Sequence, residues 1–292
     1  MSVDACGLAA VVNTLVLYGA CLLATGSAIF AVVFRVPALW PLLRRLVVLG
    51  SVLGALATGM RPLLRTGMLL DEGLAGMIDP EMLALIWAGP TGVAAQIRLG
   101  GLLLLVGALA WGPGRGRAPT VAGVMLVLVS FTIAGHVAAD APWWLRLGLL
   151  VHLLGLAYWV GAFWPLHRAA GGACGQQQTA AIADRFGRLA VWLVPLLLLA
   201  GGLLAWMLVG SWQALAGTAY GRLLLLKVLA VTALLGLALM NKRVLVPAMY
   251  KGSSAAFARL RGVIRLEACV VALVLLLTAL LTNTVELPVV PD

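Results

Sequence analysis

The stretch VHLLGLAYWVGAFWPLHR (residues 151–168) is an apolar run with one histidine, His152, close to its start. A helix rises about 1.5 Å per residue, so about 20 apolar residues cross the ~30 Å hydrocarbon layer of a membrane. Leu, Ala, Gly and Val dominate, and the short alternating strands of a membrane β-barrel are absent. The stretch therefore predicts a membrane-spanning helix that carries an ionisable group.

The rest of the chain has the same character. Of its 292 residues, 63% are hydrophobic and only 10% are charged, which is outside the usual composition of a soluble domain. We expect an all-α integral membrane protein embedded in the lipid bilayer. The apolar runs predict eight spans, at 8–34, 46–66, 91–111, 120–138, 143–166, 187–210, 221–240 and 262–283.

The charges predict how the spans are oriented. The net charge is +10, but the cations lie in short loops rather than in a nucleic-acid-binding patch, so we expect no nucleic-acid partner. Basic loops follow the first, third, fifth and seventh spans, and neutral or acidic loops follow the others. By the positive-inside rule the basic loops are cytoplasmic, which makes both termini periplasmic. MSVDACGLAA has no basic region, so we expect the first span to be retained.

Two segments of the chain resemble each other. TGVAAQIRL (91–99) and TAYGRLLLLKV (218–228) each have a threonine near a glycine, and a cation six residues after that glycine. The cations are Arg98 and Lys227. This pattern predicts a parallel repeat of two four-helix transmembrane halves, 1–141 and 142–292.

His136, His152, Arg98 and Lys227 are all expected in the outer half of the membrane. His152 and Lys227 each lie roughly 13 Å inside the outer boundary, and Arg98 lies roughly 10 Å inside it. His136 is near the outer end of the fourth span. His167 lies at the cytoplasmic end of its span, where we expect an interfacial side chain rather than a ligand.

His152 has two interpretations. As a structural residue, it is a neutral imidazole that hydrogen-bonds to a neighbouring helix. As a site residue, it binds a metal or a haem, with Gly155 and Trp159 on the same helix face leaving room and supplying an aromatic wall. His136 faces the same choice, since a histidine in a last helical turn can simply meet water.

The two cations and the sulfur atoms also have two interpretations each. Arg98 and Lys227 either extend to the outer headgroups or act as structural or gating charges beside the histidines. Met60, Met68 and Cys21 are either packing residues or soft ligands that, with imidazole, favour Cu(I). The four cysteines form no CxxC pair, so neither a zinc site nor a disulfide framework is predicted.

Motifs for ATP-driven transport and for hydrolysis are missing from the sequence. There is no GxxxxGK[ST] loop, no DKTG segment, no HExxH and no Ser/His/Asp set. We therefore do not expect an enzyme.

Several ordered segments of the second half resemble the CopD family of bacterial copper-resistance membrane proteins. They are HLLGLAYWVGAFWPL (152–166), DRFGRLAVW (184–192), the AGGLLAWMLVG ending of the sixth span, TAYGRLLLLKVLAVTALL (218–235) followed by Asn241, and RLEACVVALVLLLTALLT (265–282). IRLG (97–100) and GHVAAD (135–140) extend the resemblance into the first half.

This resemblance implies copper transport and homeostasis at the bacterial inner (plasma) membrane, usually as uptake from the periplasm. It also implies a soluble periplasmic copper carrier of the CopC type as partner. His136 and His152 match histidines of the family pattern, which makes them candidate copper ligands. The family pattern includes no methionine cluster, so Met60, Met68 and Cys21 are added only as sulfur helpers.

A second resemblance gives the alternative function. The pattern from His152 through Trp159 to Gly161, with Lys227 on a later helix, is similar to the haem-dependent protoporphyrinogen oxidase family. That similarity implies a membrane redox protein with haem b bound by His152 and Lys227. A third hypothesis is an assembly subunit with no transport of its own.

Overall fold

The computed structural model describes residues 5–70, 73, 75–112, 116–134 and 142–284, and every regular element within them is helical. The helices are α1 (Ala5–Phe34), η1 (Pro37–Leu39), α2 (Trp40–Leu70), η2 (Ala75–Ile78), α3 (Pro80–Ala88), α4 (Pro90–Ala108), η3 (Leu109–Trp111), α6 (Arg117–Ser130), α7 (Trp143–Arg168), η4 (Ala169–Ala173), α8 (Gln176–Val209), α9 (Trp212–Gly217), α10 (Ala219–Met240), η5 (Asn241–Leu245), α11 (Val246–Tyr250) and α12 (Ser254–Asn283). The all-α prediction is confirmed.

Within the described residues, seven helices are long and apolar enough to cross a membrane, which confirms a multi-pass membrane protein. The span predicted at 120–138 corresponds to α6, which has 14 residues and is shorter than the others. The end of that predicted span falls beyond the described residues. The count of eight therefore stays a prediction.

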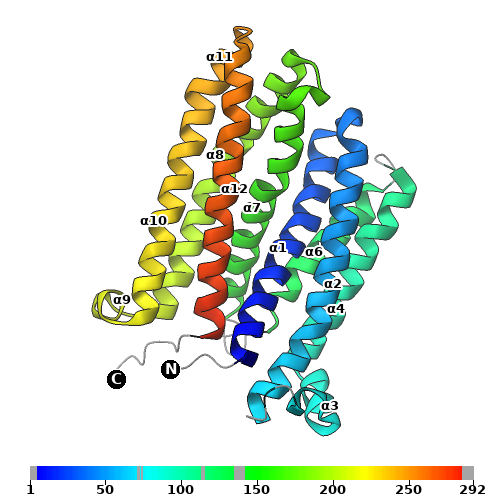
Figure 1. Ribbon diagram of the computed structural model, residues 1–292, viewed down its shortest axis with the longest axis vertical. Helices are drawn as coiled ribbons and strands as arrows, with labels where there is room; N and C mark the ends of the chain where they lie inside the picture. The colour runs from blue at the N-terminus through cyan, green and yellow to red at the C-terminus, as the bar shows by residue number, and fades with distance from the viewer. Residues whose placement is uncertain (1–4, 71–72, 74, 113–115, 135–141, 285–292) are drawn as a thin grey trace.

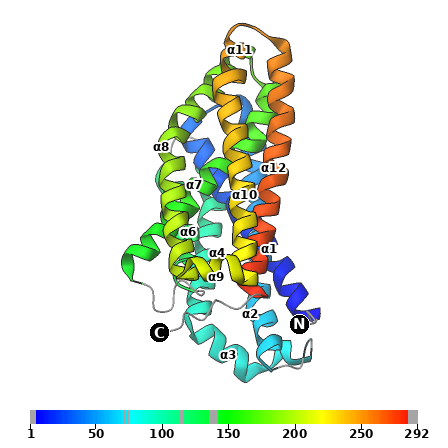
Figure 2. The ribbon, with the colours of Figure 1, turned by 90° about the vertical axis from the view of Figure 1, so that its left-hand side faces the viewer.

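The long helices run side by side along one axis (Figures 1 and 2). The start of α1 and the end of α12 lie at the same end of the bundle as α3 and α9, and α11 lies at the opposite end. Nδ2 of Asn283 donates to Oγ1 of Thr14 at 3.1 Å, which ties α12 to α1 near that shared end. An even number of spans requires the start of α1 and the end of α12 to lie at the same end of the bundle. Which end faces the periplasm stays a prediction.

The predicted repeat has a local structural counterpart. A short helix precedes each of α4 and α10, and the first turn of the long helix packs against it. A Cβ atom on Gly92 would overlap the backbone of Trp87 in α3, and one on Gly221 would overlap the backbone of Leu215 in α9. The two glycines that aligned in sequence thus allow the same close approach in both halves. The division at residue 141 itself stays a prediction.

Helix α1 packs against α2, α7 and α12 and joins two apolar cores. One core contains residues of α1, α2, α4 and α6, and the other is built mainly from α7, α8, α10 and α12, with α1 contributing Leu22 and Phe30. Where α1 crosses α7, a Cβ atom on Gly26 would overlap Ala157 and Gly161, and one on Gly161 would overlap Gly26. Small residues allow such backbone contact between helices in a membrane.

Replacing Gly161 by valine should destabilise the bundle, because the added side chain has no space against the backbone of α1. We expect the free energy of unfolding to fall by about 1–3 kcal/mol or more. Thermal unfolding in detergent, followed by tryptophan fluorescence, measures the change. Gly19→Ala is the matched control, since no atom lies within 4 Å of a Cβ atom added at that position of α1. Equal unfolding temperatures for both variants would contradict the proposed crossing.

Candidate functional site

His152 lies on α7 and faces α8. Its Nδ1 atom is 3.1 Å from the carbonyl oxygen of Leu197. A carbonyl oxygen only accepts, so Nδ1 carries a proton, and in the neutral ring Nε2 then carries a lone pair. No described residue hydrogen-bonds to Nε2. An imidazole held by a backbone carbonyl at one nitrogen, with a lone pair at the other, is the usual arrangement of a metal-binding histidine.

Close packing positions this ring. A Cβ atom on Gly201 of α8 would lie 3.0 Å from both Nδ1 and Cε1 of His152, so the glycine provides the space for the imidazole. Opposite it, a Cβ atom on Gly155 of α7 would lie 2.9 Å from the side chain of Leu197. The space that Gly155 was expected to leave for a ligand is therefore filled by Leu197. Nothing in the described residues supports the haem alternative.

The positive charge of Lys227, on α10, acts on the His152 ring. Its side chain is only partly exposed. Among the residues that the structure describes, the one ion pair joins Arg188 to Asp184, so Lys227 has no carboxylate partner there. The site thus combines a neutral imidazole with an uncompensated positive charge.

Arg98 forms a second polar site in the first half. Its side chain is buried, and its Nε atom donates to Oγ of Ser130 at 3.0 Å. Its guanidinium carbon lies 4.1 Å from the ring centre of Phe131. Arg98 therefore points into the bundle and does not extend to the headgroups. Cys21 and Tyr18 of α1 also interact electrostatically with it.

The predicted ligands are distributed over several places. Cys21 is buried beside Gly54 of α2, and His152 lies at the α7–α8 contact. The side chains of Met60 and Met68 are exposed on α2, 43% and 42% respectively, so they point away from both sites. In the described part of the chain, no three His, Cys, Asp or Glu residues lie close enough to hold a metal ion. His136 lies outside the described residues.

One buried polar group was missed by the sequence analysis. Glu267 of α12 is 4% exposed and accepts a hydrogen bond from Nδ2 of Asn241 at 2.9 Å. The side chain of Trp159, expected beside His152, lies close enough to act on the same carboxyl group. The available signal was a single acidic residue between Arg265 and a long apolar run, the same kind of signal that identified His152.

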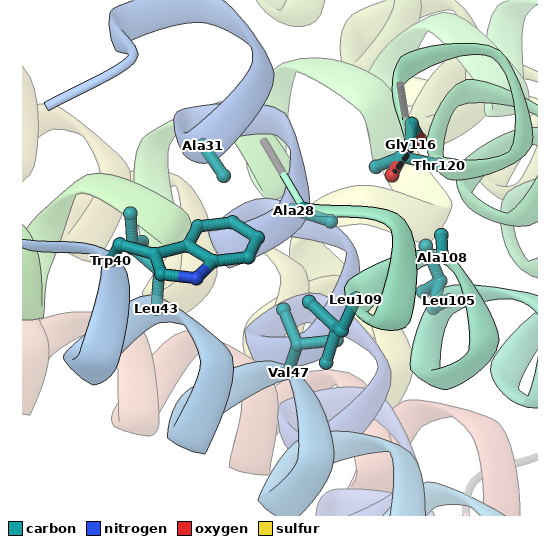
Figure 3. A pocket seen from close by; sticks show the side chains of 11 residues that line it. Ala28, Ala31, Trp40, Leu43, Val47, Leu105, Ala108, Leu109, Gly116 and Thr120 are labelled. Carbon is teal, nitrogen blue, oxygen red and sulfur yellow. Dashed lines mark hydrogen bonds between the residues drawn. The ribbon is translucent and has the colours of Figure 1, made fainter. Parts of the chain in front are cut away.

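A small cavity lies elsewhere, between α1, α2, α4 and the start of α6 (Figure 3). Its volume is about 20 Å³, and the Trp40 ring closes one side of it. Its lining is apolar except for Thr120, whose hydroxyl donates to the carbonyl oxygen of Gly116 at 2.6 Å. No predicted ligand lines it, so it is not the candidate site.

Comparison with known families covers most of the chain. The family model described as Copper resistance protein D matches residues 180–281. The model described as Copper resistance protein D-like, N-terminal domain matches residues 3–147. No curated protein and no solved structure matches the chain.

Replacing Ser130 by alanine should leave the Nε donor of Arg98 unpaired inside the bundle. We expect a loss of about 1–3 kcal/mol in the free energy of unfolding. Chemical denaturation in detergent micelles provides the measurement. Ser254→Ala removes an exposed hydroxyl at the start of α12 and should change little. Similar stabilities for the two variants would show that Arg98 does not depend on Ser130.

Proposed function

Because this chain belongs to the copper resistance protein D family, we propose that it transports copper across the bacterial inner membrane, from the periplasm toward the cytoplasm. Family membership establishes a copper-related role for a multi-pass membrane protein. The transport step, its direction and the residues that perform it are our proposal. Copper is the transported substrate here, not a resident cofactor.

The observation that carries the proposal is the state of His152. Imidazole nitrogen is a good ligand for copper, and a neutral ring with a free lone pair is the form that binds a metal. The carbonyl oxygen of Leu197 lies 3.1 Å from Nδ1 and fixes the orientation of the ring. Nε2 therefore needs no rearrangement of the side chain to bind a metal. Ionisable side chains within membrane-spanning helices are rare and by default indicate a functional site, which favours a role beyond packing.

His136 is the second proposed ligand. In sequence it follows Ser130, the partner of Arg98, by six residues. The family resemblance, rather than geometry, supports it. Cys21, Met60 and Met68 are proposed as sulfur ligands because of their residue type. They are placed at points of the path away from His152, since Cys21 lies against α2 and the two methionines face outward.

The positive charge of Lys227 weakens the binding of copper at His152. A positive charge near His152 raises the free energy of a copper ion bound there. A transport site must bind its ion strongly enough to admit it and weakly enough to release it. Lys227 therefore serves as a gating charge. Arg98 serves a structural role through Ser130 and Phe131.

A periplasmic copper carrier of the CopC type is the proposed donor. This partner rests on the family resemblance alone.

Expression of the chain should raise cellular copper above the level of an empty vector. His152→Ala and His136→Ala should bring accumulation back toward that level, because each removes a proposed ligand. Elemental analysis of washed cells measures the metal. His167→Ala is the matched control, since this histidine lies at the opposite end of α7 and should leave accumulation unchanged. Accumulation that persists in a correctly folded His152→Ala protein would refute the proposal.

A further inference from the structure

A buried carboxyl group lies deep in the second half, apart from His152. Glu267 is 13 residues from the start of α12 and 16 residues from its end, which puts it roughly 20 Å from one end of the helix and 24 Å from the other. It is 4% exposed. An ionised carboxylate at such a position carries a desolvation cost of several kcal/mol unless a cation compensates it.

No cation compensates it among the described residues. The groups that act on Glu267 are both neutral: Asn241 donates a hydrogen bond to it, and the indole of Trp159 lies close to it. Titratable or charged groups occur on α12 itself and on the larger helices packed against it. They are Cys6, Tyr18 and Cys21 on α1; Arg146, His152, Tyr158, His167 and Arg168 on α7; Tyr220, Arg222 and Lys227 on α10; Lys242 and Arg243 on η5; Tyr250 on α11; and Arg259, Arg261, Arg265 and Cys269 on α12. None of them forms an ion pair with Glu267.

Asn241 contributes a second, independent observation. Its Nδ2 atom donates to Oε1 of Glu267, but its Oδ1 atom is buried and has no hydrogen-bond partner. A buried acceptor without a donor costs about 1–3 kcal/mol. Asn241 also begins the π-helix η5, and π-turns within α-helices occur frequently at functional sites.

A single proton removes both costs. A protonated carboxyl group is neutral, and its O–H is the donor that Oδ1 of Asn241 lacks. A carboxylic acid and a primary amide pair through two hydrogen bonds, N–H to carbonyl and O–H to amide oxygen. The first of these is already present at 2.9 Å. We propose that Glu267 and Asn241 form a proton-binding site inside the membrane.

Infrared spectroscopy of the purified protein tests this site without copper, so the result does not depend on the proposed transport function. Exposed carboxyl groups ionise near pH 4. At neutral pH we therefore expect the carbonyl band of one protonated carboxylic acid, which should disappear as the pH is raised well above neutral. Glu267→Gln should abolish this band, and Glu81→Gln, which changes an exposed glutamate on α3, should leave it intact.

A second variant keeps the carboxyl group and changes only its partner. Asn241→Leu removes the amide, so the band should remain but shift to higher frequency as the carbonyl loses its hydrogen bond. This variant also serves if Glu267→Gln does not fold. Absence of the band in the unchanged protein at neutral pH, or its survival in folded Glu267→Gln protein, would overturn the proposal.

Discussion

The contact between Gly26 and Gly161 is the point on which the rest of the bundle depends. At this crossing the backbones of α1 and α7 touch, so neither position has space for a side chain. Because α1 contributes to both apolar cores, the contact fixes the first half against the second. Lipid provides no hydrophobic driving force between helices, which leaves close packing and hydrogen bonds to hold them together. The crossing supplies the close packing.

Polar groups supply the hydrogen bonds, and each of these groups has a specific partner. Arg98 donates to Ser130, His152 is held by the Leu197 carbonyl, and Glu267 accepts from Asn241. These contacts join different helices, and the paired residues lie 26 to 45 positions apart in the sequence. A buried polar group needs such a partner, and the atoms that remain without one therefore indicate function. Among the described residues, such buried atoms are Oδ1 of Asn241 and the Oγ atoms of Ser27 and Ser51, and of these only Oδ1 lies beside a buried carboxyl group.

The sequence predicted the helical fold and most spans, because hydrophobic length is a strong local signal, while the depth of His152 in the membrane stays a prediction. It did not predict which face of each helix is buried. Met60 and Met68 were grouped with the histidines by residue type, but their side chains face outward on α2. Gly155 was expected to leave a space that Leu197 fills, because side-chain packing between α7 and α8 is not encoded in either segment alone. Glu267 lies inside the eighth predicted span, but it was overlooked because its only partner, Asn241, comes from another helix.

The central claim is that His152 binds the copper that this protein handles. X-ray absorption spectroscopy of the copper-loaded protein tests it most directly, because imidazole ligands produce a characteristic outer-shell scattering pattern around the metal. The account predicts imidazole scattering in the unchanged protein and a clear loss of it in the His152→Ala variant, with the His167→Ala spectrum unchanged. An identical copper environment with and without the His152 imidazole would contradict the account.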